Sequence, residues 1–113
     1  MLVNKMVLKK INGQQFKELI RYGALNLRAN FEEVDSLNVF PVPDGDTGTN
    51  MLRTIEGGVN SVAKLSTDDI GELGKELSKG MLMSARGNSG VILSQIFRGI
   101  CKGLEGKKEV NAL

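Results

Sequence analysis

Two carboxylates stand two positions apart, at Asp44 and Asp46, around a glycine that permits backbone angles closed to other residues. Both can therefore converge on one point, and two anions held so close repel each other unless a cation lies between them. A hard divalent ion such as Mg²⁺ prefers one or two carboxylates together with waters and substrate phosphates. The spacing indicates a Mg²⁺ site, and a surface Asp-Gly turn remains the alternative at this point.

A second short segment is rich in small side chains and hydrogen-bond donors. Its members are Ser84, Gly87, Asn88, Ser89 and Gly90. A turn of this composition leading into a helix can hold phosphates through backbone N–H groups. Arg86 within it can add a forked contact to a phosphate, although a solvated charge is an equal alternative for a single loop arginine.

The first loop also leads into a predicted helix, whose opening N–H groups and positive dipole end attract anions. Thr47, Thr49 and Asn50 add hydroxyl and amide donors there. Paired acids and two donor-rich helix openings together predict a metal-nucleotide site, and phosphoryl transfer is the chemistry that suits them.

Other chemistries are excluded by what the sequence lacks. With no His there is no Ser-His-Asp triad, no His base and no His metal ligand. A Ca²⁺ loop counted from Asp44 fails because Thr49 and Ile55 stand where Gly and Glu are needed. Neither a P-loop nor a dinucleotide-binding glycine pattern occurs. Asp44 to Thr47 loosely resembles the loop of haloacid-dehalogenase phosphatases, but Pro41 and Pro43 argue against the strand that loop requires.

The composition bears on the binding partners and the cellular location that can be expected. The net charge is +2, and the aromatic residues are four Phe and one Tyr, so nothing predicts nucleic-acid binding. The single Cys101 cannot form an internal disulfide and is expected to pack as an apolar residue. The first ten residues are too short and too interrupted by Lys for a signal or membrane segment. We expect a cytoplasmic protein.

Apolar residues recur at helical spacing through most of the chain, which predicts an all-α fold of about four main helices. The first begins after the N-cap Asn12 and runs to about Ser36. The second is expected from Thr49 or Asn50 to about Leu65, the third from after Thr67 to about Ser84, and the fourth from Val91 to a stop at Gly103 or Gly106. No element is expected in the polar tail from Lys107, and Gly57-Gly58 inside a helix has no explanation from sequence alone.

Two long segments in this order resemble a known family. They are residues 38–51, Asn-Val-Phe-Pro-Val-Pro-Asp-Gly-Asp-Thr-Gly-Thr-Asn-Met, and residues 85–95, Ala-Arg-Gly-Asn-Ser-Gly-Val-Ile-Leu-Ser-Gln. Both closely resemble the N-terminal kinase domain of bacterial fatty acid kinase catalytic subunits, which is related to the nucleotide-binding L subunit of dihydroxyacetone kinase.

The resemblance implies an antiparallel all-helical barrel whose rim loops hold ATP or ADP through two Mg²⁺ ions. Asp44 and Asp46 then correspond to metal ligands, and Asn38 stands near a further metal-binding Asp of the relatives, with Asp35 as the other candidate for that place. The implied nucleotide contacts are Thr47, Gly48, Thr49, Asn50, Ser84, Arg86, Gly87, Asn88, Ser89 and Gly90. Thr47 replaces a His of the dihydroxyacetone kinase relatives.

The implied activity is transfer of the γ-phosphoryl group of ATP to a fatty acid carried by a separate fatty-acid-binding protein, which gives an acyl phosphate. The alternatives are a dihydroxyacetone-type kinase subunit and a nucleotide- or metal-binding module without turnover. Residues 1–113 are expected to form the N-terminal portion of a single longer kinase domain, and to be inactive or weakly active alone. Incompletely covered apolar faces are expected to favour self-association; they are Phe16, Leu27, Ile55, Leu77, Ile96 and Phe97.

Overall fold

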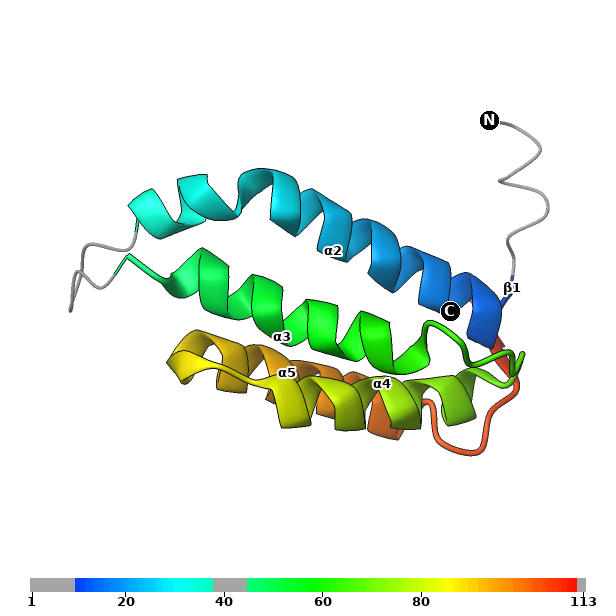
Figure 1. Ribbon diagram of the computed structural model, residues 1–113. Coiled ribbons are helices and arrows are strands. Elements are labelled where there is room, and N and C mark those ends of the chain that lie inside the picture. The colour runs from blue at the N-terminus through cyan, green and yellow to red at the C-terminus, as the bar shows by residue number, and fades with distance from the viewer. Residues whose placement is uncertain (1–9, 38–44, 112–113) are drawn as a thin grey trace.

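The computed structural model describes residues 10–37 and 45–111, and within these ranges the fold is four helices and one pair of short strands (Figure 1). The helices are α2 (Gly13–Ser36), α3 (Thr47–Val62), α4 (Ile70–Ser84) and α5 (Gly87–Gly103). Successive helices run antiparallel, and α3 packs against all three others. The all-α prediction is confirmed. No helix in the described part of the chain is long and apolar enough to cross a membrane.

The first predicted helix is confirmed together with its cap. The Asn12 side chain accepts a hydrogen bond from the Gln15 backbone N–H at 3.0 Å, and the Gln15 side chain accepts one from the Asn12 N–H at 2.9 Å. This reciprocal pair is a capping box, which satisfies two N–H groups that no helical carbonyl can reach. The helix ends at Ser36, as its apolar pattern predicts.

The helix boundaries around the two loops differ from the predictions. Helix α3 begins at Thr47 with Asp46 as its N-cap, three or four residues before the predicted caps Thr49 or Asn50, and it ends at Val62. Helix α5 begins at Gly87, so residues 87–90 are its first turn and not part of a loop. The turn between α4 and α5 needs only Ala85 and Arg86, because Gly87 takes a φ of 65° that few other residues adopt.

A strand pair that the sequence did not predict joins the two ends of the described chain. Strands β1 (Lys10–Asn12) and β2 (Glu109–Asn111) are antiparallel, with Ile11 opposite Val110. The expectation of a tail without structure after Lys107 is therefore wrong for residues 109–111. Three-residue strands are too short to show a period-two pattern, which is why the sequence gives no signal for them.

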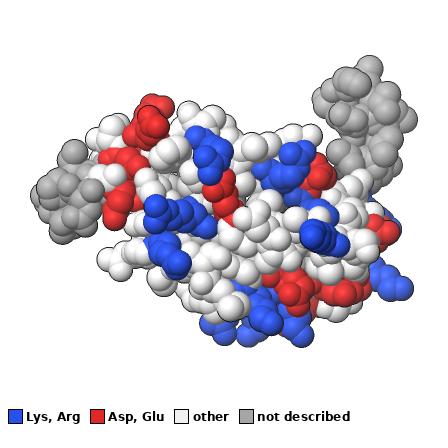
Figure 2. Space-filling view, viewed as in Figure 1, with Lys and Arg blue, Asp and Glu red and all other residues white. Residues whose placement is uncertain are grey.

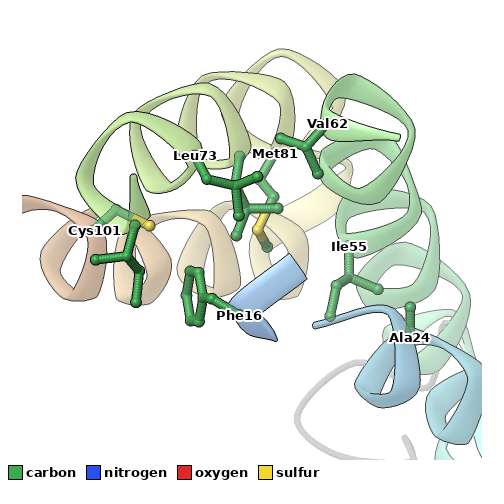
Figure 3. Packing of buried hydrophobic residues seen from close by; sticks show 9 residues of the cluster. Phe16, Ala24, Ile55, Val62, Leu73, Met81 and Cys101 are labelled. Atoms are coloured by element: carbon green, nitrogen blue, oxygen red, sulfur yellow. The ribbon is translucent and has the colours of Figure 1, made fainter. Parts of the chain in front are cut away.

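The core lies between the four helices and is centred on α4 (Figure 3). Four apolar residues of α4 at helical spacing are completely buried: Ile70, Leu73, Leu77 and Met81. Cys101 is 3% exposed, and burial raises the pKa of its thiol to about 11, in keeping with a packing role. The expectation that Phe16, Ile55 and Leu77 lack cover is wrong, because all three are buried within this chain.

Helices α3 and α4 approach each other so closely that only glycine fits at several positions. A Cβ on Gly57 would collide with the Ser84 side chain, and one on Gly58 would collide with Met81. In the same way, a Cβ on Gly80 would collide with the Ser61 side chain. The Gly57-Gly58 pair thus costs helix propensity but permits the packing that fixes α4 against α3.

Candidate functional site

The starts of α3 and α5 lie at the same end of the molecule, where α2 and α4 end (Figure 1). The Ser89 hydroxyl donates a hydrogen bond to the carbonyl oxygen of Thr47 at 3.3 Å, which joins the two helix openings directly. The structure therefore brings two helix N-termini together, each with a positive dipole end and N–H groups at its first turn.

Glycines make this close approach possible. A Cβ on Gly87 would collide with the Asn50 side chain, and one on Gly90 would collide with the Thr54 hydroxyl. A larger residue at Gly90 would press on the buried Thr54 side chain, and one at Gly87 would displace the Asn50 side chain. Glycine at both positions therefore has a packing role between the helices, which sequence spacing alone cannot reveal.

Thr54 is a residue of this end that the sequence analysis missed. Its side chain is fully buried; its hydroxyl donates to the carbonyl oxygen of Asn50 at 2.8 Å and accepts from the Arg86 backbone N–H at 3.3 Å. It thereby ties the α4–α5 turn to α3. Its hydroxyl on the apolar face of a predicted helix, one turn after Asn50, is the sequence feature that could have indicated a buried polar contact here.

The N-cap positions of α3 and α5 are occupied by Asp46 and Arg86, and neither makes a side-chain cap hydrogen bond. At α3 a carboxylate from another helix takes this role. Asp35, in the last turn of α2, accepts from the Thr49 backbone N–H at 2.9 Å and from the Thr49 hydroxyl at 2.5 Å.

These contacts change the acidity of Asp35. The hydrogen bond from the Thr49 hydroxyl is the largest influence and lowers the pKa of Asp35, whereas partial burial opposes it. Backbone N–H groups of Thr49 and Gly48 lower the pKa further. The charged carboxylate is thus the form that suits this end of α3.

The remaining predicted nucleotide contacts have varied surroundings. Gly48 is buried against α2, where a Cβ would collide with the Phe31 carbonyl oxygen. Ser84 packs on Gly57. Arg86 is exposed, and its Nη1 donates to the Ala85 carbonyl oxygen at 3.1 Å. Asn88 is exposed in the first turn of α5.

Of the three predicted metal ligands, only Asp46 is described, and it is exposed at the start of α3. Asn38 and Asp44 lie outside the described residues. Within residues 10–37 and 45–111 no three acidic or Cys side chains gather into a metal-binding group. The predicted set, two carboxylates and an amide oxygen, consists of the hard oxygen donors that Mg²⁺ prefers, so its chemistry fits that ion.

Comparison with known proteins agrees with this arrangement. The family model of the DAK2 domain matches residues 41–113, about two-thirds of the chain, including residues 41–51 of the first segment and all of the second.

Similar proteins occur in several bacteria. The chain is 58% identical over 108 residues to protein YloV of Bacillus subtilis, covering 96% of this chain and 20% of that protein. It is 60% identical over 105 residues to an uncharacterized protein of Staphylococcus epidermidis, covering 93% of this chain and 19% of that protein. The chain thus spans about a fifth of the length of the curated relatives it matches. DAK2 domains are related to the nucleotide-binding subunit of dihydroxyacetone kinase. Because the family model matches most of the chain and the fold is all-α, the chain belongs to the DAK2 domain family.

Proposed function

We propose that this chain is the nucleotide-binding part of a kinase that transfers the γ-phosphoryl group of ATP to a fatty acid. The observation that carries the nucleotide site is the meeting of two helix N-termini, that of α5 and that of α3, which directly follows the Asp-Gly-Asp segment. Both openings offer a positive dipole end to one polyphosphate, and the first turn of α5 offers N–H donors as well.

Each part of this end has a role in the proposal. Backbone N–H groups of the first turn of α5 bind phosphate oxygens, the Ser89 hydroxyl joins this turn to that of α3, and the Asn50 side chain lies between the two turns. Asp44 and Asp46, with Asn38, hold Mg²⁺, which neutralises charge on the phosphates when bound.

The charge around the site explains why a cation is needed. Acidic side chains gather at the end of the molecule where α2 ends and α3 begins (Figure 2). They include Glu32, Glu33 and Asp35 near the end of α2, together with Asp46. A bare nucleotide polyphosphate approaching these carboxylates would be repelled, and a divalent cation between them removes that repulsion.

The acceptor is proposed from the resemblance in residues 38–51, whose Pro-Val-Pro-Asp-Gly-Asp-Thr-Gly form favours the fatty acid branch. A carboxylate oxygen of the fatty acid attacks the γ-phosphorus, the bond to the β–γ bridging oxygen breaks, and ADP and an acyl phosphate form. A separate fatty-acid-binding protein presents the acid. The alternatives are a hydroxy-ketone acceptor, as in dihydroxyacetone kinase, and nucleotide binding without turnover.

The nucleotide site can be tested on this chain. We would titrate Mg²⁺-ADP calorimetrically into the chain, into the variant Asp44→Ala with Asp46→Ala, and into Asp68→Ala with Glu105→Ala. The last variant removes the same charge from exposed positions at the opposite end of the molecule. We expect at least about a hundredfold weaker binding for the first variant only, because Mg²⁺ ligands are lost. Equal binding by all three proteins would remove the assignment.

The reaction needs the longer protein, because this chain spans about a fifth of its relatives and is expected to bind nucleotide with little or no turnover. The full-length protein would be incubated with ATP, Mg²⁺, a fatty acid and candidate binding proteins. Acyl phosphate trapped as a hydroxamate supports the proposal. Phosphorylation of dihydroxyacetone supports the alternative kinase, and neither product supports a binding module.

The chain alone is also expected to self-associate. Helix α5 has an exposed row of apolar side chains in the described structure, with Ile96 54% exposed. The other members are Val91, Ile92 and Ile100. An apolar row of this size is normally covered by another surface. Light scattering that finds a monomer at micromolar concentration would contradict this expectation.

A further inference from the structure

We propose that Asp35 is a positioning residue for the nucleotide site: it caps α3 from the end of α2 and is not a metal ligand. The inference rests on the proposed function, because the site it positions is the proposed Mg²⁺-nucleotide site. It removes Asp35 from the candidates for a third metal ligand.

Asp35 caps α3 with the geometry of an ordinary N-cap side chain. Thr49 is the third residue of α3, and its N–H is one that an N-cap side chain ordinarily binds. Here that N–H donates to Asp35 Oδ1 at 2.9 Å, although Asp46 occupies the N-cap position. The cap therefore comes from a residue fourteen positions earlier in the chain.

The cap also connects two helices. The Asp35–Thr49 contact joins the last turn of α2 to the first turn of α3, and so fixes both ends of the segment that contains Asp44. Gly48 strengthens the junction, since it packs against the Phe31 carbonyl and the Val34 side chain. Fixing both ends of a loop reduces the conformational entropy that its ligand-binding residues lose on binding.

Both carboxylate oxygens of Asp35 accept hydrogen bonds. Both are engaged by the same residue: Oδ1 accepts from the Thr49 N–H, and Oδ2 accepts from the Thr49 hydroxyl at 2.5 Å. A metal ion on these oxygens would place positive charge beside both donor hydrogens and beside the positive end of α3. Asp35 thus suits the helix end as an anion and suits a cation poorly.

A double-mutant cycle with Asp35→Asn and Thr49→Val tests this proposal. Hydrogen exchange of the amides of residues 47–50 is measured without ligand, and residues 70–73 at the start of α4, which Asp69 caps, are the control. Each variant is expected to speed exchange at residues 47–50 at least about fivefold, as loss of a cap does. The double variant should be no worse than either single variant, and Thr49→Ser should restore slow exchange.

Binding measurements separate positioning from metal ligation. At saturating Mg²⁺, both single variants are expected to weaken ADP binding about fivefold, with little change in the Mg²⁺ concentration that gives half-maximal binding. A metal ligand would behave differently: Asp35→Asn alone would raise that Mg²⁺ concentration, and Thr49→Val would not, which would overturn the proposal. Unchanged exchange in both variants would also overturn it. Absence of Mg²⁺-ADP binding by the unmodified chain would refute the proposed nucleotide site, while the exchange result would still decide the cap.

Discussion

The two ends of the helical bundle differ in how the polar backbone groups of their helix termini are satisfied. At the end that carries β1 and β2, other parts of the chain take up the polar groups of the helix ends. The N–H groups of Ile70 and Gly71 donate to the carbonyl oxygens of Lys108 and Lys107, each at 2.9 Å. At the other end, the Asp35 carboxylate accepts from the Thr49 N–H at the start of α3, whereas Arg86 makes no side-chain cap hydrogen bond at the start of α5.

The end that carries β1 and β2, here called the tied end, has further hydrogen bonds from α2. The Gly13 N–H donates to the Asp68 carbonyl oxygen at 2.7 Å, and the Gln14 side chain donates to the carbonyl oxygens of Leu65 and Thr67 at 3.0 and 2.7 Å. Helix-end groups satisfied inside the protein contribute to its stability, whereas helix openings brought together by glycines suit an anionic ligand. We therefore assign stability to one end and binding to the other.

The largest expected effect is on stability, and it should leave binding alone. Leu73 is fully buried in the half of α4 nearest the tied end, so Leu73→Ala should lower the free energy of unfolding by about 3 kcal/mol through lost burial and a cavity. Leu82→Ala on the same helix is the control, because Leu82 is exposed and its loss should change stability by less than about 0.5 kcal/mol. Urea unfolding measures both. Similar losses for the two variants would refute the placement of the core.

A smaller loss of stability, coupled to a loss of binding, is expected from Gly87→Ala. The new Cβ would collide with Asn50 and would sit at a φ of 65°, which should cost about 1–2 kcal/mol. It should also weaken Mg²⁺-ADP binding several-fold, since α5 must move from α3. The matched control is Gly103→Ala, where a Cβ would meet nothing within 4 Å. Unchanged nucleotide affinity in Gly87→Ala, measured by calorimetry, would separate α5 from the site.

The next effect appears only in acid. Because the folded-state pKa of Asp35 is lowered, its contribution to stability is present above the unfolded value of about 3.9 and is lost as pH falls through the lower folded value. The difference in unfolding free energy between the chain and Asp35→Asn should thus be constant from pH 7 to pH 5 and shrink below about pH 4. Urea titrations across this range measure it. A difference that persists unchanged at pH 3 would mean that Asp35 acts without its charge.

The smallest effect is expected from the ion pair between α2 and α3. Arg28 Nε lies 2.7 Å from Glu56 Oε2, but both side chains are partly exposed to solvent. Exposed pairs contribute little to stability, so Arg28→Ala should leave the thermal unfolding midpoint nearly unchanged. A shift as large as that of Gly87→Ala would show that this pair is important for packing α2 on α3.

What the sequence could predict depended on whether the interaction was local. Helix α2 was predictable because its apolar spacing and its Asn12–Gln15 capping box are encoded within a few residues. The pairing of Lys10 with Asn111 was not, because it joins positions a hundred residues apart through three-residue strands. Gly57 could be explained only once α4 was known to pack on it.

The site follows the same rule. Residue types near Asp46 and Gly87 indicated two anion-binding segments, and the structure places those segments side by side. The contacts that align them are Thr54 with Arg86 and Asp35 with Thr49, which are 32 and 14 positions apart. No local spacing encodes such pairs, so the contacts that align the two segments could not be predicted from the sequence.

The central claim is that one end of the bundle binds Mg²⁺-nucleotide across two helix openings. Amide chemical shifts recorded by NMR during a titration with Mg²⁺-ADP test it most directly. The account predicts that residues 46–50 and 86–90 shift together with a single affinity, while residues 10–12 and 109–111 do not move. Shifts confined to one helix opening, or centred on the strand end, would contradict it.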